Sequence, residues 1–169
     1  MNLDFSTFTW VHVIISLIGI VTGFVVMKGM LASQRLDDWT AVFLATTALT
    51  SITGFGFPFE KLLPSHIVGI ISLVVLLIAI VARYAFGMSG GWRPAYVVTA
   101  LVAQWLNVFV LVVQLFQKVT ALHALAPNGS EPPFLIAQTV IMVLFIIVGI
   151  AALRQFRPAG TASSGLRPS

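Results

Sequence analysis

The residues most able to do chemistry in this chain are its histidines, each of which lies inside or beside a long apolar stretch. An imidazole can ligate a haem iron or hydrogen-bond a quinone, so two at similar depth in a membrane form a possible redox site. We take His12 and His66 as the candidate cofactor residues, and expect Gln114 and Gln138 to complete the site. The cofactor that this predicts is haem b or a quinone.

A second pattern is a stripe of amide side chains at helical spacing. Gln104, Asn107 and Gln114 follow one another at intervals of three and seven residues, which places them on one face of a helix. Gly19 and Gly23 form a GxxxG spacing within another apolar stretch, which permits close helix contact. Such a stripe either lines a path for a solute or ion, or serves as polar contact between packed helices.

Other chemistries are excluded or weakly indicated. The chain has no cysteine, so disulfides, thiolate metal sites and iron–sulfur clusters are excluded. No hydrolase or transferase motif is present, and the basic residues form no patch that would bind nucleic acid. The remaining metal candidates are His12, His66, His123 and Glu60, whose spacing matches no known ligand motif.

The elements that must position these residues are membrane-spanning helices. Of the 169 residues, 59% are hydrophobic and only 8% charged, far from the composition of soluble domains. Five segments are long and apolar enough to span a bilayer. The sequence therefore predicts one all-α transmembrane bundle over residues 1–157, with helices at about 8–30, 40–57, 63–86, 94–117 and 134–153, and a disordered cytoplasmic tail over 158–169. The many small residues of segment 40–57 predict that this helix is central in the bundle.

The basic residues predict the orientation of the bundle. If the N-terminus is outside, one side of the membrane carries Lys28, Arg35, Arg83, Arg93, Arg154, Arg157 and Arg167, and the other carries Lys61 and Lys118. Because cytoplasmic loops retain positive charge, the C-terminus is predicted to be cytoplasmic. All three histidines then lie on the outer side.

Two stretches, SITGFGFPFEKLLPSHIVGIISLVVL and LNVFVLVVQLFQKVTALHALAPNGSEPPF, resemble segments of small bacterial inner-membrane proteins to which no activity is assigned. The resemblance implies a multi-pass protein of the bacterial inner membrane and a short helical bundle.

From these patterns we expect an inner-membrane protein with a periplasm-facing site of histidine and polar residues, which binds a ligand or cofactor in a redox or accessory role. The alternatives are a channel or transporter subunit lined by the amide stripe, and a scaffold subunit of a membrane complex. The expected partners are the lipid bilayer and either further copies of the chain or another membrane protein.

Overall fold

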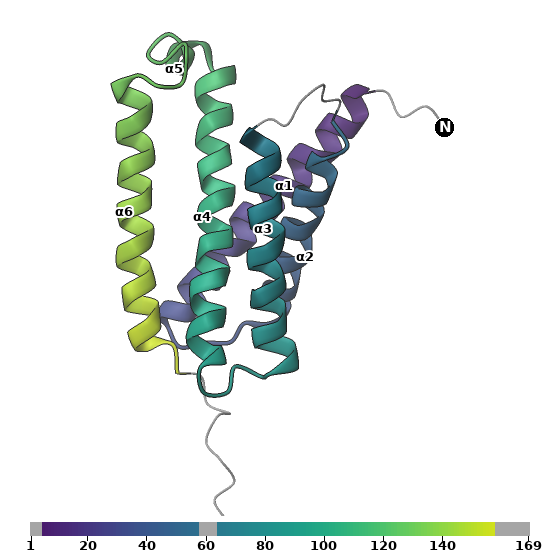
Figure 1. Ribbon diagram of the computed structural model, residues 1–169, viewed down its shortest axis with the longest axis vertical. Helices are drawn as coiled ribbons and strands as arrows, with labels where there is room; N and C mark the ends of the chain where they lie inside the picture. Colours follow the sequence, from purple (N-terminus) through teal and green to yellow (C-terminus); the bar gives the residue numbers. More distant parts are fainter. Residues whose placement is uncertain (1–4, 58–63, 158–169) are drawn as a thin grey trace, which may run out of the picture.

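The computed structural model describes residues 5–57 and 64–157, and these are helical with short connections and no strand (Figure 1). Five long helices are present: α1 (Phe5–Leu31), α2 (Asp37–Gly54), α3 (Pro64–Ile80), α4 (Trp92–Lys118) and α6 (Pro132–Gln155). A π-helical turn, η1 (Val81–Ala85), ends α3, and a single helical turn, α5 (Thr120–His123), lies between α4 and α6. The prediction of an all-helical chain is confirmed.

Four of these helices, α1, α3 with η1, α4 and α6, are long and apolar enough to cross a membrane, as a multi-pass membrane protein requires. The fifth predicted span, 40–57, corresponds to α2, which begins at Asp37 and Asp38 and ends at Gly54. These two carboxylates and its run of threonines keep α2 below the apolar content of the other four. A transmembrane role for α2 therefore stays a prediction, as do the domain limits; the predicted tail, 158–169, lies outside the described residues.

The long helices run alternately up and down, which divides the bundle into two ends (Figure 1). The histidine end, at the top of the figure, holds the first turns of α1 and α3 together with α5, and thus His12, His66 and His123. The basic end, at the bottom, holds Lys28, Arg35, Arg83, Arg93, Arg154 and Arg157. This gathering agrees with the predicted charge bias, while the side of the membrane that each end faces stays a prediction.

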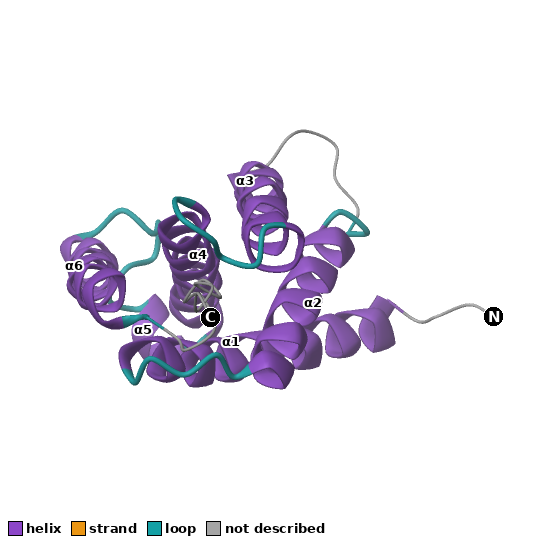
Figure 2. Cartoon of the chain, turned by 90° about the horizontal axis from the view of Figure 1, so that it is seen from below, coloured by secondary structure: helices purple, strands orange, loops and turns teal. Residues whose placement is uncertain are grey.

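The helix packing differs from the expected one, because α4 and not α2 is the most buried helix. Viewed from the basic end, α2 lies between α1 and α3, while α4 lies between α3 and α6 (Figure 2). One side of α2, with Phe43 and Thr47, is buried, but Leu49 and Ile52 on the other side are exposed. The small residues of α2 thus permit close contact with α1 without placing α2 at the centre.

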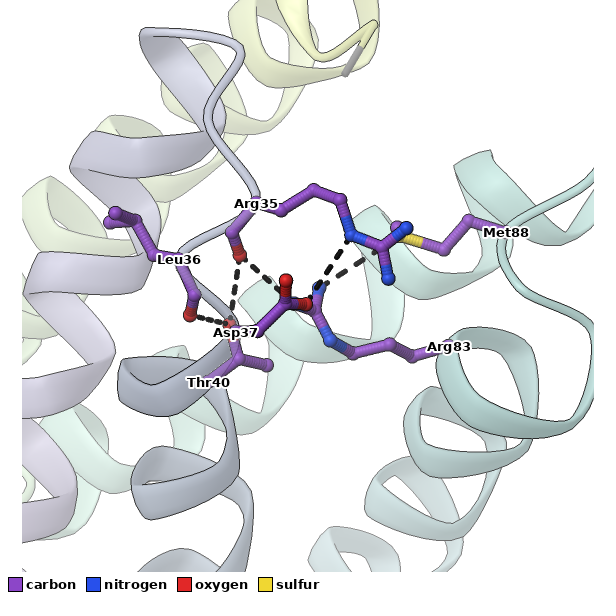
Figure 3. Close-up of polar contacts among 6 residues, drawn as sticks. All are labelled: Arg35, Leu36, Asp37, Thr40, Arg83 and Met88. Atoms are coloured by element: carbon purple, nitrogen blue, oxygen red, sulfur yellow. Dashed lines mark hydrogen bonds and ion pairs between the residues drawn. The ribbon is translucent and has the colours of Figure 1, made fainter. Parts of the chain in front are cut away.

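At the basic end, the side chain of Arg83 is fully buried. It contacts the residues at the start of α2 (Figure 3). Its Nη2 donates to the Asp37 carboxylate and, at 2.9 Å, to the Arg35 carbonyl, and its guanidinium lies 5.0 Å from the centre of the Tyr96 ring. Arg83 lies in the π-helical turn that follows α3, where the helix is wider than an α-helix. One side chain thereby joins η1, α4 and the connection between α1 and α2.

Within the connection between α1 and α2, Leu36 has a backbone conformation that leucine rarely adopts. Leu36, directly before α2, has φ 44° and ψ 59°, the left-handed region that costs a bulky residue about 1–2 kcal/mol. Its side chain lies against Gly29, where an added Cβ would be 2.5 Å from Leu36 Cδ1. The contacts of Arg83 on both sides of Leu36 hold this turn in place (Figure 3).

Candidate functional site

A cavity of about 620 Å³ lies between α1, α2, α3 and α4, in the half of the bundle nearer the histidine end. The exposed surface of its wall is mainly apolar, although polar side chains from all four helices also line it. This size and composition are typical of sites for small lipophilic molecules. The polar residues in its wall are Thr9, His12, Ser16, Thr50, Ser51, His66, Ser72, Asn107, Gln114, Gln117 and Lys118.

Three of the four predicted site residues line this cavity: His12 from α1, His66 from α3 and Gln114 from α4. They come from segments up to 102 residues apart in sequence, and the alternating helix directions bring them to one end. The fourth, Gln138, lies elsewhere: its Nε2 donates to the Phe109 carbonyl at 3.1 Å, between α6 and α4. The structure thus brings two of the predicted histidines and one of the predicted amides to a single cavity, without α6.

The imidazole of His12 is oriented by Thr53 of α2, whose Oγ1 lies 2.8 Å from Nδ1. The Thr53 hydroxyl also lies 2.7 Å from the Leu49 carbonyl, to which it can donate its one hydrogen. This pair of contacts favours the tautomer with the proton on Nδ1, which leaves a lone pair on Nε2. An imidazole fixed in this way can accept a hydrogen bond from a ligand or coordinate a metal centre through Nε2.

His66 is 5% exposed in the first turns of α3, and its ring lies 5.7 Å from that of Phe55. Phe55 also packs over Gly69, where an added Cβ would be 3.1 Å from the phenylalanine ring. Deeper along the same wall, the hydroxyls of Ser51 and Ser72 lie 3.1 Å apart. The α2–α3 side of the cavity thus combines an aromatic contact with hydroxyl groups.

The amide stripe of α4 is divided between packing and the cavity. Gln104 is 1% exposed, and its Nε2 donates to the Ile20 carbonyl of α1 at 2.9 Å. Its amide fills the space left by Gly23, and Gly19 similarly lies against the threonines of α2. Of the three amides, only Asn107 and Gln114 reach the cavity, and Asn107 also donates to Thr47 Oγ1 at 3.0 Å. Gln104, the residue of the stripe nearest the basic end, therefore packs α4 against α1 and does not line this cavity.

A site for a bare metal ion finds less support in the geometry. Among residues 5–57 and 64–157, no three His, Asp or Glu side chains gather closely enough to hold a metal. His123 is exposed on α5 and does not line the cavity, and Glu60 lies outside the described residues.

The sequence does not show that His12 contacts Thr53 or that Arg83 pairs with Asp37. Thr53 is one of several helical threonines there, and Arg83 and Asp37 are only charges near helix ends. The one signal for the ion pair is the placement of an arginine inside an apolar segment, since such a residue is usually buried against a partner.

Comparison of the chain with protein-family models, with curated proteins and with solved structures finds no match. The site is therefore interpreted from its geometry alone.

Proposed function

We propose that the cavity binds a lipophilic molecule with a hydrogen-bonding ring, of the quinone class, and that the protein serves a redox or accessory role in the membrane. The observation that carries the proposal is the position of His12 in the wall of this cavity, with its Nδ1 held 2.8 Å from Thr53 Oγ1. Within that cavity His66, Gln114 and the serines offer further polar groups around an apolar body. In the predicted orientation, the site faces the outer side.

A quinone fits this wall better than a haem held by two histidines. Haem ligation needs both imidazoles at opposite faces of one iron. Here α2 lies between the helices that carry the two histidines, and Phe55 and Phe57 pack against their rings at 5.7 and 5.1 Å. A quinone requires only one imidazole at one carbonyl or hydroxyl group, and aromatic rings beside the head group suit it. The haem alternative is an explicit outcome of the test below.

The test starts from protein purified in mild detergent. Oxidised and reduced absorption spectra are recorded, a solvent extract is assayed for quinones, and the binding of a short-chain benzoquinone and naphthoquinone is measured by calorimetry. Loss of one hydrogen bond of about 1–1.5 kcal/mol weakens binding by about five- to thirteenfold, which is the effect expected for His12→Phe. Thr53→Val keeps the imidazole but removes its orienting group, so a smaller loss is expected.

His123→Ala is the matched control, because it removes an exposed imidazole at the same end of the bundle but outside the cavity. Equal quinone affinity in the wild type, His12→Phe and Thr53→Val proteins would contradict the proposal. Sharp reduced haem bands that disappear in both His12→Phe and His66→Phe proteins would replace the quinone by a b-type haem.

A further inference from the structure

A second, wholly apolar hollow of about 300 Å³ lies on the other side of α4 from the candidate site. It is lined by Phe24 and Met27 of α1, by Val108 of α4 and by the side chains of α6 from Ile141 to Val148 that face them. We call it the α6 fissure. No polar side chain lines it.

Among the described residues, α6 is hydrogen-bonded to α4 at two levels and has only apolar contacts between them, and the α6 fissure lies in this interval. Towards the histidine end, Gln138 donates to the Phe109 carbonyl. At the basic end, Arg93 Nη1 donates to the carbonyls of Leu153 and Phe156. From residue 140 to residue 152, α6 has no polar side chain, and Ala152 alone is buried within this fully described helix.

In a membrane the hydrophobic effect does not close such a gap, because lipid chains are as apolar as the side chains. An unfilled fissure loses the dispersion contacts of every atom that lines it. The natural occupant is therefore a hydrocarbon chain from the surrounding lipid. The charged residues at the end of the fissure indicate the kind of lipid.

Lys28 directly follows Met27 and lies one helical turn from Phe24, so it stands at the basic end of the fissure. Arg154, in the last turn of α6, is at the same end. Both side chains are exposed, and neither forms an ion pair with any residue that the structure describes. A second copy of the chain is disfavoured there, because copies with the same orientation in one membrane would bring these cations together.

We propose that the α6 fissure holds one acyl chain of an anionic phospholipid, whose phosphate pairs with Lys28 while Arg154 adds to the positive field. This proposal rests on membrane insertion and is independent of the ligand in the candidate site. Basic side chains at the membrane surface attract anionic headgroups, so the lipid is held jointly by its chain and its charge.

The test uses the full chain in nanodiscs and in mixed micelles that contain phosphatidylglycerol or phosphatidylcholine with identical acyl chains. The unfolding temperature and the lipid retained in native mass spectra are measured. We expect phosphatidylglycerol to raise the Tm by about 5 °C relative to phosphatidylcholine, as a ligand in large excess over its Kd does. Lys28→Gln should remove most of that difference, whereas Lys118→Gln, which removes the same charge at the other end, should preserve it.

A second variant tests the acyl chain. Val148→Phe adds a ring to the fissure wall and should reduce the retained lipid of both kinds without unfolding the protein. Equal Tm values in the two lipids, an equal effect of Lys28→Gln and Lys118→Gln, or lipid-free dimers in the mass spectra would overturn the proposal. His12→Phe should leave the lipid effect unchanged, which separates this outcome from that of the candidate site.

Discussion

Replacing Gly23 by alanine is the sharpest test of how α1 and α4 pack. A Cβ at this position would lie 1.9 Å from Gln104 Oε1 and 2.4 Å from its Cδ, far closer than real Cβ atoms approach other heavy atoms. The Gln104 side chain is 1% exposed and donates to the Ile20 carbonyl. The amide must therefore leave its position, because the glycine backbone cannot move away without separating the helices.

The cost follows from the interactions that this substitution breaks. The hydrogen bond to Ile20 contributes about 0.6–1.5 kcal/mol, and a buried amide left unpaired costs about 1–3 kcal/mol. The higher helix propensity of alanine offsets up to about 1 kcal/mol of this loss of stability. We therefore expect Gly23→Ala to lower the free energy of unfolding by about 1–3 kcal/mol.

The matched control is Gly149→Ala on α6. A Cβ there would meet Leu101 Cδ1 at 3.8 Å, an ordinary contact, so this variant should be neutral or slightly more stable than the wild type. Unfolding by sodium dodecyl sulfate in mixed micelles, followed by circular dichroism, compares the two variants.

A double-mutant cycle then identifies the cause. In a Gln104→Ala background the clashing amide is absent, so adding Gly23→Ala should no longer destabilise the protein and should stabilise it by up to about 1 kcal/mol. Equal stability of the Gly23→Ala and Gly149→Ala proteins would refute the proposed contact. So would additive effects of Gly23→Ala and Gln104→Ala.

Two further predictions concern charged groups. Asp37→Ala should destabilise the protein more than Arg83→Met. The first variant leaves a guanidinium that is 0% exposed without its carboxylate, which costs about 3–5 kcal/mol. The second leaves only a carboxylate that is 62% exposed to water. The same unfolding assay compares the stabilities of the two variants, and a less stable Arg83→Met protein would contradict the buried position of Arg83. The other prediction concerns Glu131, which directly precedes α6. Desolvation raises its pKa, but hydrogen bonds from the Asn128 backbone and side chain and from the Ser130 N–H outweigh this effect and lower the pKa to about 2. Because this pKa lies below the ordinary value of 4.5, the turn should be fully stabilised above pH 4.5 and lose that stabilisation as the pH falls through about 2. A loss of amide-exchange protection at residues 128–131 on acidification, measured relative to the intrinsic exchange rate at each pH, should show this, and Glu131→Gln should remove the pH dependence of the protection.

The helical class and the approximate extent of the long helices follow from local sequence patterns alone. Apolar length and flanking breakers are local properties, so the predicted segment 94–117 and the observed α4 (Trp92–Lys118) differ by two residues or fewer at each end. The same local patterns placed all the histidines at one end, because helices joined by short connections must alternate in direction. That is why His12, His66 and Gln114 could be expected together.

Tertiary packing decided what those patterns left open. A stripe on a helix shows which residues share a face but not which neighbour that face meets, so Gln104 contacts Gly23 and Ile20, while Gln114 lines the cavity. Gln138 faces α4 away from the site for the same reason.

The hydrogen bond between His12 and Thr53 and the contact between Arg83 and Asp37 each join two side chains more than 40 residues apart. Small residues made α2 resemble a central helix, although only packing could show that α4 is the more buried one. Local sequence determines the length and direction of each helix, because those depend on neighbouring residues. The partners of each face depend on rotation and crossing, which are set only when all the helices pack together.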